Sequence, residues 1–361
     1  MSQTFCRHKR FIQRCPICRE TLPGWKAEHQ RTPVKHPSKD HGAPEEQSNG
    51  VASAEATKRV GADLAGNARE PAPRSSTRRA PQVRVHHEAR SVDDGYRCEL
   101  VPGLRSSHDA LRFVQEIGFS SGRLLTFTAA PPGLYGEARA CEDIEQATWM
   151  CFLAAYLSPL EGFQSFAGIR QALVCSWASG RVADLEDAPL GPRTSHDPAR
   201  GSETLAAYRR FAEHAGSQER AFAGEPEWTP QRRFERAFER LALPGFGRVG
   251  RYDLLITLGR LGLYDLRADS LHLAARSPHS ASHLDGQTLL AAKRIFGIGD
   301  LLLLERRASA LAQALGSPIE ALDLALWNWS RPTPEERATL GFPTDTVDPH
   351  ALERAHSALE I

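Results

Sequence analysis

The stretch of sequence that decides the fold is Leu243-Pro244-Gly245-Phe246-Gly247-Arg248-Val249-Gly250. Pro244 and the glycines around it end one helix and permit a tight turn into the next. Apolar residues recur at helical spacing on both sides of this stretch, as Phe234, Phe238 and Leu241 before it and as Leu254, Leu255, Leu258 and Leu261 after it. The sequence therefore predicts a hairpin that joins two amphipathic helices.

The predicted turn has the features of an anion site. A glycine-lined turn that opens a helix presents free backbone N–H groups and the positive end of the helix dipole. The two arginines that follow it add side-chain charge that suits a phosphate group. We therefore expect phosphate contact from Gly245, Gly247, Arg248, Gly250 and Arg251. The alternative is an ordinary helix stop that binds nothing.

Residues 243–247 resemble the hairpin of helix-hairpin-helix DNA glycosylases, which grips the backbone of double-stranded DNA. In that superfamily a catalytic aspartate follows the hairpin by one helix and a short connection, at the start of the next helix. The resemblance implies that Asp269 is this residue, after a helix over 254–263 and at a helix start in Asp269-Ser270-Leu271-His272. The alternative is that Asp269 is only a helix cap.

The resemblance also implies a chemistry. In a glycosylase, a carboxylate stabilises the positive charge that develops on the sugar and helps to deprotonate the attacking water. Relatives that form a Schiff base carry a lysine just after the hairpin, where this chain has Arg248-Val249-Gly250-Arg251-Tyr252. No cysteine follows Cys175, so the sequence lacks the iron–sulfur loop of several relatives. We expect a monofunctional DNA N-glycosylase without an iron–sulfur cluster.

Polar residues at the two ends of a helix predicted over 141–157 are candidates for a base pocket. In helix-hairpin-helix glycosylases, the loop after the corresponding helix directs polar side chains towards the DNA and the base that is flipped out of the duplex. The resemblance implies this role for Ser158 and Glu161, with Glu145 and Gln146 as further candidates. The alternative is that all four are solvated polar residues on the helix surface and its loop.

Four segments together resemble a more specific group, the alpha-glutamyl/putrescinyl thymine pyrophosphorylases, which are themselves related to DNA glycosylases. These segments are residues 143–161, the hairpin, residues 291–297 and residues 322–329. Members of the group act on modified pyrimidines in phage DNA, and related bacterial proteins are anti-phage glycosylases that remove bulky modified bases.

Three functions follow from this resemblance. The first is a glycosylase that flips out and excises a modified pyrimidine of phage DNA, such as hydroxymethylated or glucosylated cytosine, in anti-phage defence. The alternative is a base-hypermodifying transferase, in which an amine displaces pyrophosphate from an activated hydroxymethyl-pyrimidine in DNA. The third is a DNA-binding module that keeps the hairpin without the chemistry.

The N-terminal residues predict a zinc knuckle over 1–22. Cys6, His8, Cys15 and Cys18 supply four metal ligands within a segment too small to bury a core, so the metal would supply its folding energy. The alternative is an unstructured tail. Residues 23–94 are rich in Pro, Ser, Glu, Arg, Ala and Gly, which predicts a disordered linker.

Residues 95–361 predict a mainly α-helical domain. Helices are expected over 107–117, 141–157, 203–222, 289–296, 301–315 and 318–329, with one short strand over 123–128. The formal net charge of the 361 residues is +1, so DNA would be met by local charge rather than by a global field. No membrane span or secretory signal is expected, and with its CxxC-type cysteines the chain is expected to be cytoplasmic. We also expect a monomer.

Overall fold

The computed structural model describes residues 91–181, 184–185, 187–275, 285–331 and 336–361. The chain divides into two units, Met1–Ala80 and Pro81–Ile361, and all described residues belong to the second. The predicted zinc ligands and almost all of the predicted linker lie outside the described residues, so both stay predictions.

The second unit is built from helices, and the described ranges contain no strand. The prediction of a mainly α-helical domain is confirmed. The helices are, in order, α2 (Ser107–Ala129), α3 (Gly133–Ala140), α4 (Ile144–Leu157), α5 (Ala167–Ala172), α6 (Gly201–Ala215), α7 (Gln218–Ala223), α8 (Pro230–Arg240), α9 (Arg248–Arg260), α10 (Asp285–Phe296), α11 (Leu301–Leu315), α12 (Glu320–Trp329) and α13 (Pro349–Leu359). None of them combines the length and the apolar character that a bilayer crossing requires.

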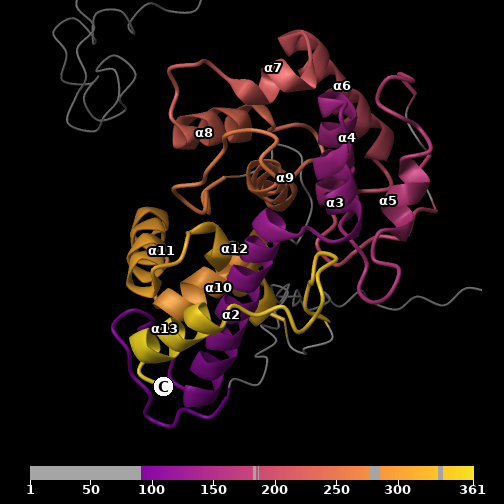
Figure 1. Ribbon diagram of the computed structural model, residues 1–361. Helices are drawn as coiled ribbons and strands as arrows, with labels where there is room; N and C mark the ends of the chain where they lie inside the picture. The colour runs from indigo at the N-terminus through magenta and orange to yellow at the C-terminus, as the bar shows by residue number, and fades with distance from the viewer. Residues whose placement is uncertain (1–90, 182–183, 186, 276–284, 332–335) are drawn as a thin grey trace, which may run out of the picture. The chain divides into compact units, whose positions relative to one another are not determined.

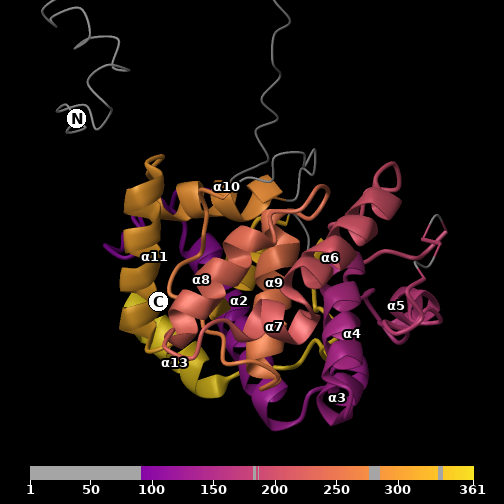
Figure 2. The same ribbon diagram turned by 90° about the horizontal axis from the view of Figure 1, so that it is seen from above.

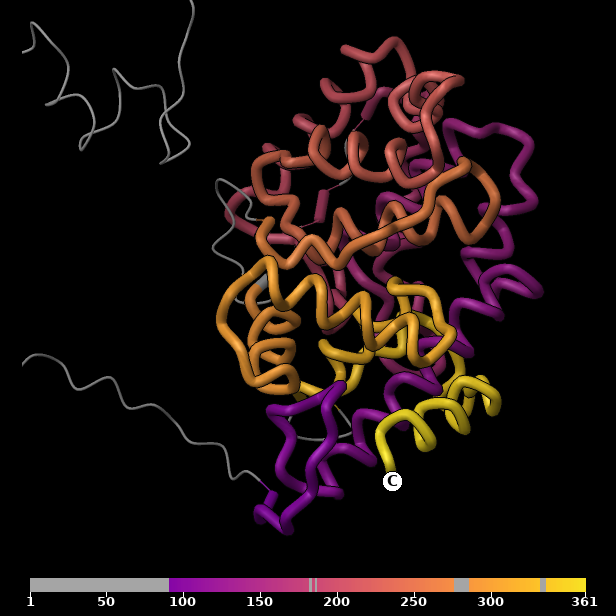
Figure 3. Tube along the Cα trace, turned by 90° about the vertical axis from the view of Figure 1, so that its left-hand side faces the viewer, coloured from indigo at the N-terminus to yellow at the C-terminus, as the bar shows by residue number. Residues whose placement is uncertain are grey.

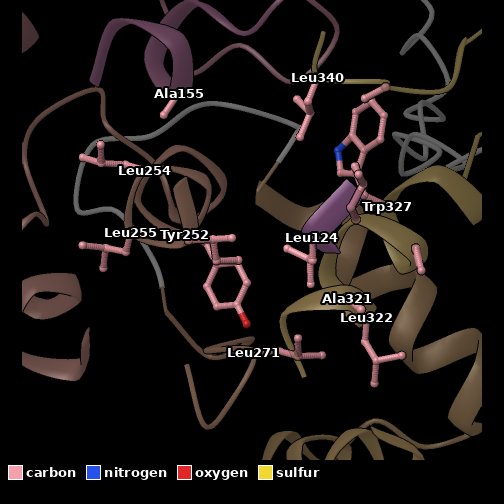
Figure 4. Close-up of a cluster of buried hydrophobic side chains, with 14 of the residues drawn as sticks. Leu124, Ala155, Tyr252, Leu254, Leu255, Leu271, Ala321, Leu322, Trp327 and Leu340 are labelled. Atoms are coloured by element: carbon pink, nitrogen blue, oxygen red, sulfur yellow. The ribbon is translucent and has the colours of Figure 1, made fainter. Parts of the chain in front are cut away.

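Helix α9 lies between two groups of helices, α4 to α8 on one side and α10 to α13 on the other (Figures 1 and 2). It packs against α4 and α8, while α2 packs along α12 and α13 (Figure 3). Figure 4 shows where these elements meet, with Leu124 of α2, Tyr252 of α9 and Trp327 of α12 in one buried cluster. Helix α9, which follows the hairpin, is therefore central to the fold.

The strand predicted over 123–128 is wrong, because α2 continues through it to Ala129. Ile117, Leu124 and Phe127 are spaced as one face of a helix and are all buried. The single helix predicted over 203–222 is also wrong. It breaks at Gly216, whose φ of +92° ends α6, and Ser217 then caps α7.

Most other helix predictions are confirmed. Helix α4 starts at Ile144 because the Asp143 side chain accepts hydrogen bonds from the backbone N–H groups of Glu145 (2.9 Å) and Gln146 (3.3 Å). Helix α11 has the predicted bounds, with Asp300 as its cap. Helices α3, α5 and α13 were not among the predicted elements.

Candidate functional site

The predicted hairpin is present between α8 and α9. Gly245 takes a φ of +72°, and the Phe246 N–H donates to the Leu243 carbonyl over 3.1 Å to close the turn. Gly247 is the N-cap residue directly before α9, and it has no side chain to cap the helix. The N–H groups that open α9 therefore lie at this turn, as the sequence predicts.

Protein surrounds the glycines of the turn. A Cβ on Gly245 would lie 2.2 Å from Thr204 Oγ1, and one on Gly250 would lie 2.5 Å from Ser195 Oγ. Residues 245–250 are all buried. The hairpin packs against the start of α6 and the residues before it, so these glycines permit close packing rather than an open phosphate cradle.

Gly245 and Gly262 offer a matched pair of substitutions. Both take a left-handed φ, +72° and +74°, but nothing lies within 4 Å of a Cβ on Gly262. We expect Gly262→Ala to cost about 1–2 kcal/mol of unfolding free energy from strain alone, and Gly245→Ala to cost about 1–3 kcal/mol more from overpacking. Urea unfolding measures both, and Thr204→Ala should recover the excess at Gly245. Equal costs for the two glycine variants would contradict the close packing.

Arg248 and Arg251 lie in the core, with only 1% and 2% of their surface exposed. Arg248 donates from Nε and Nη2 to the Leu271 carbonyl. Arg251 donates from Nη1 to the Phe238 carbonyl over 3.2 Å, and its guanidinium carbon lies 4.4 Å from the Phe238 ring centroid. The expectation that these side chains bind DNA phosphate is corrected, because both hold the hairpin to its own protein.

Arg248 belongs to a buried ion cluster, which we define as Arg193, Arg248, Asp253 and Asp323. Asp323 of α12 accepts from Arg193 Nη2 at 2.8 Å and from Arg248 Nη2 at 2.6 Å. Arg193, from the loop before α6, also binds Asp253 of α9 through Nε (2.9 Å) and Nη2 (3.0 Å). The cluster joins the hairpin, α9 and α12.

The electrostatics of the ion cluster favour the ionised carboxylate. Burial by itself raises the pKa of Asp323, but Arg248 and Arg193 outweigh it, and the net pKa is lowered. Arg193 Nη1, Arg248 Nη1 and Trp327 Nε1 are buried and have no hydrogen-bond partner. Three buried donors, one each from the loop before α6, from α9 and from α12, therefore remain unused beside the ion cluster.

A segment over 269–275 runs beside the cluster, and the helix start predicted at Asp269 is wrong. The segment has no helix, and α10 begins only at Asp285. Long-range contacts take the place of helical hydrogen bonds. Glu305 accepts from the N–H groups of Leu271 (2.8 Å) and Leu273 (2.6 Å), and the Tyr252 hydroxyl donates to the Ser270 carbonyl over 3.0 Å.

Asp269 is exposed on this segment rather than buried, so its carboxylate faces solvent at the edge of the fixed backbone. Three residues later, His272 takes a φ of +51°, which is uncommon for a residue with a side chain. Its ring stacks on Phe238 at a centroid distance of 4.2 Å. Burial, followed by the charge of Arg248, lowers the pKa of His272 to about 4.

The lowered pKa of His272 predicts a pH dependence of stability. The unfolded chain binds a proton near the ordinary pKa of about 6.5, whereas the folded chain binds it only near 4. Stability should therefore fall as the pH drops from 6.5 towards 4. His272→Asn, which tolerates the positive φ, should make the urea midpoint depend less steeply on pH across this window, and buried His196, whose pKa is also lowered, accounts for part of the remaining slope. The exposed variant His214→Asn should leave the pH dependence unchanged. A wild-type midpoint that is flat between pH 6.5 and 4.5 would contradict the burial of a neutral imidazole.

The four residues implied as a base pocket do not lie together. Glu145 and Gln146 sit at the start of α4, and Ser158 and Glu161 follow its end. At about 1.5 Å per residue, the helix separates the two pairs by roughly 18 Å. The two pairs are therefore too far apart to face the same base, and the base-pocket roles of the four residues stay predictions.

Each of the four also has a structural partner. Glu145 accepts from the N–H groups of Gln218 (3.1 Å) and Glu219 (2.8 Å), and Gln146 accepts from the Trp177 N–H at 2.8 Å. Buried Ser158 accepts from the Arg193 N–H at 3.4 Å, and Glu161 accepts from the Thr339 N–H at 2.9 Å. These contacts fix α7 and the loops around α4.

A cavity of about 580 Å³ lies among the end of α9, the connection that follows it and the start of α12. Ala268, directly before Asp269, lines it, together with Arg139, Arg260, Arg267 and Glu320. Glu320 is bound to Arg260 at 2.6 Å and to the Ala268 N–H at 3.2 Å. Three arginines against one paired carboxylate give the cavity a net positive charge of two, which suits an anionic group.

No group of three or more His, Cys, Asp or Glu side chains within the described ranges is arranged to hold a metal. The predicted zinc ligands, Cys6, His8, Cys15 and Cys18, lie outside these ranges, so the zinc site stays a prediction.

Sequence reasoning missed Arg193, Asp253 and Asp323. A signal existed for Asp323, because it is the only charged residue in the apolar run Ala321-Leu322-Asp323-Leu324-Ala325-Leu326-Trp327. A lone carboxylate in such a run must be paired if it is buried. Nothing local indicated that its partners lie 130 and 75 residues away in the sequence.

No curated protein and no solved structure matches the chain. A family model does match part of it. The matched residues include the hairpin, the 269–275 segment and three members of the ion cluster, Arg248, Asp253 and Asp323. Residues 194–337 are similar to the family described as alpha-glutamyl/putrescinyl thymine pyrophosphorylase clade 3, in agreement with the more specific resemblance predicted from the sequence.

Proposed function

We propose that the protein is a base-hypermodifying transferase, which replaces pyrophosphate on an activated hydroxymethyl-pyrimidine in DNA with an amine. The observation that carries this proposal is the family match over residues 194–337, whose description names a thymine pyrophosphorylase. The matched stretch supplies most of the elements described above. This function was the alternative prediction from the sequence, and the match favours it over excision of the base.

The proposed reaction exchanges one bond at the exocyclic methylene carbon. The C–O bond to pyrophosphate breaks, and pyrophosphate leaves with the electron pair. The amine nitrogen forms the new C–N bond and then loses a proton, which Asp269 accepts as a general base. The exposure of Asp269 supports this role, because its carboxylate is accessible to a large substrate.

The positive cavity next to Ala268 supports a role for charge in the same reaction. Arg139 and Arg267 are exposed at the cavity, and Arg260 is held there by Glu320. Guanidinium groups that are already in place stabilise the negative charge that develops on a phosphate leaving group. The protein then does not have to reorganise during the reaction. The target base would have to leave the duplex to reach such a site, at a cost of a few kcal/mol.

A monofunctional DNA glycosylase is the second candidate. The exposed Asp269 carboxylate, which follows a hairpin without a lysine, favours it. In that reaction water attacks the sugar carbon, the C–N bond to the base breaks and an abasic site remains. Such a glycosylase would excise hydroxymethylated or glucosylated cytosine from phage DNA in anti-phage defence.

One experiment separates the two candidates. The full chain is incubated with duplex DNA that carries pyrophosphorylated hydroxymethyluracil, with and without glutamate or putrescine, and with DNA that carries hydroxymethylated or glucosylated cytosine. We expect amine-dependent release of pyrophosphate and a nucleoside whose mass has increased by the added amine. Abasic sites and a free base without any amine would establish the glycosylase instead. If no substrate changes, the remaining candidate function is that of a DNA-binding module without catalytic activity.

A further inference from the structure

A second cavity, of about 600 Å³, lies next to the hairpin. One face of α6 forms most of it, at positions spaced by three and four residues, and α8 and the hairpin complete it. Its lining residues are Ala207, Arg210, Phe211, His214, Ala215, Arg240 and Leu243. We call this cavity the α6–α8 hollow.

The charge in the α6–α8 hollow is entirely basic. Arg210 and Arg240 are exposed, and neither side chain makes a hydrogen bond or ion pair with another residue of the described ranges. His214 is a third basic group, and no carboxylate lines the hollow. The C-terminal ends of α6 and α8 each contribute about half a negative charge. Two full positive charges outweigh both helix ends, so an anion is attracted.

The walls of the α6–α8 hollow are fixed by the core. Phe211 packs between Tyr208 and Phe222, with ring centroids 6.0 and 5.8 Å away. Leu243 belongs to the hairpin, whose position is set by Thr204 and Ser195. The two free guanidinium groups are therefore carried by rigid helices, which lowers the entropy that binding would cost.

We infer that the α6–α8 hollow seats a backbone phosphate of double-stranded DNA, held between Arg210 and Arg240. This inference rests on the proposed function in one respect, that the substrate is DNA. Guanidinium groups bind phosphate through paired N–H donors, and side chains that reach the surface can do this where buried Arg248 and Arg251 cannot. The hollow thus supplies the phosphate contact that the sequence assigned to the hairpin arginines.

The rest of α8 extends the same basic surface. Arg232 and Arg236 precede Arg240 by eight and four residues, so all three share one exposed face. Arg236 is paired with Glu239 at 2.9 Å, which neutralises it. Arg232 lies over the Trp228 ring at 5.3 Å and keeps its charge, so this face of α8 carries free positive charge at the hollow and again about two turns before it.

The test measures binding of a fluorescent, unmodified DNA duplex to the full chain by anisotropy at several salt concentrations. Each lost phosphate contact should reduce the slope of log affinity against log salt by about 0.9. We expect Arg210→Ala and Arg240→Ala each to weaken binding, and the double variant to lower the slope by about one. Replacement of both by lysine should retain most of the slope, because the charge remains.

Arg306→Ala is the matched control, because Arg306 is an exposed arginine of α11 that makes no hydrogen bond or ion pair within the part of the chain that the structure describes. A slope that falls equally in the control and the double variant would overturn the inference. So would displacement of the duplex by inorganic pyrophosphate at matched ionic strength that is strong for the wild type and lost in the double variant, because the hollow would then be a site for a free anion. The binding measurement does not depend on catalysis. A loss of DNA binding in the double variant can therefore be distinguished from a failure of the proposed transfer reaction. If the hollow binds DNA but the protein modifies no base, the inference stands and only the proposed reaction is wrong.

Discussion

Replacement of Asp323 by asparagine is expected to lower the free energy of unfolding by about 3–5 kcal/mol. Asp323 is 1% exposed and accepts from both Arg193 and Arg248. The amide is nearly the same size as the carboxylate but carries no charge, so it leaves two buried guanidinium groups with a single carboxylate, Asp253. Removal of one partner from a buried ion pair is costly because the remaining charge is stranded away from water.

Asp265→Asn is the control, since Asp265 also binds an arginine but its side chain is 60% exposed. Arg233 is 16% exposed, but the carboxylate of the pair is in contact with water, so we expect this pair to contribute about 0–1 kcal/mol. Urea unfolding of the two variants measures the difference. Equal losses would show that the ion cluster adds no more than a surface pair does.

The pH dependence provides a second readout for Asp323. Its pKa is lowered in the folded protein, so its stabilisation is complete above the unfolded value of about 3.9 and is lost as the pH falls through the folded value. Wild-type stability should fall below about pH 4, and Asp323→Asn should fall less steeply there. This window lies below the one expected for His272, between 6.5 and 4, so the two contributions can be measured separately.

The parts of the fold that local pattern determines were predictable. The turn at Pro244 and Gly245 follows from residues that end helices, and the bounds of α11 follow from a regular apolar stripe and the Asp300 cap. Helix α2 was cut short because its glycine and polar residues weaken the periodic signal. Those glycines allow another segment to approach, as the Asp348 N–H shows by donating to the Gly118 carbonyl over 3.0 Å.

The parts of the site that depend on long-range contacts were not predictable. Arg248 and Arg251 look like surface charge in the sequence, but α9 is buried on all sides, and a central helix must turn its polar residues towards partners. The 269–275 segment looks like a helix start. Its backbone instead bonds to Glu305, more than thirty residues away, and no local pattern reveals such a partner.

Replacement of Asp269 by asparagine is expected to slow the proposed transfer by about 10²–10⁴-fold, the usual contribution of a general base. The amide accepts no proton at neutral pH, so the attacking amine would have to lose its proton to water. Because Asp269 is exposed and lies outside any helix, the same change should alter the unfolding free energy by less than about 0.5 kcal/mol. Single-turnover pyrophosphate release, with urea unfolding beside it, measures the two quantities.

Asp265→Asn again serves as the control, since both residues are exposed carboxylates in the connection that follows α9. A general base acts by its position relative to the reacting amine, so only one of the two carboxylates can serve. A large loss of rate for Asp269 with little loss for Asp265 would place the reacting amine beside the segment that Glu305 and Arg248 hold. Full activity in both variants would show that another group removes the proton. His272 would then be the next residue to replace, because it lies three residues further along the same segment and its lowered pKa keeps it neutral.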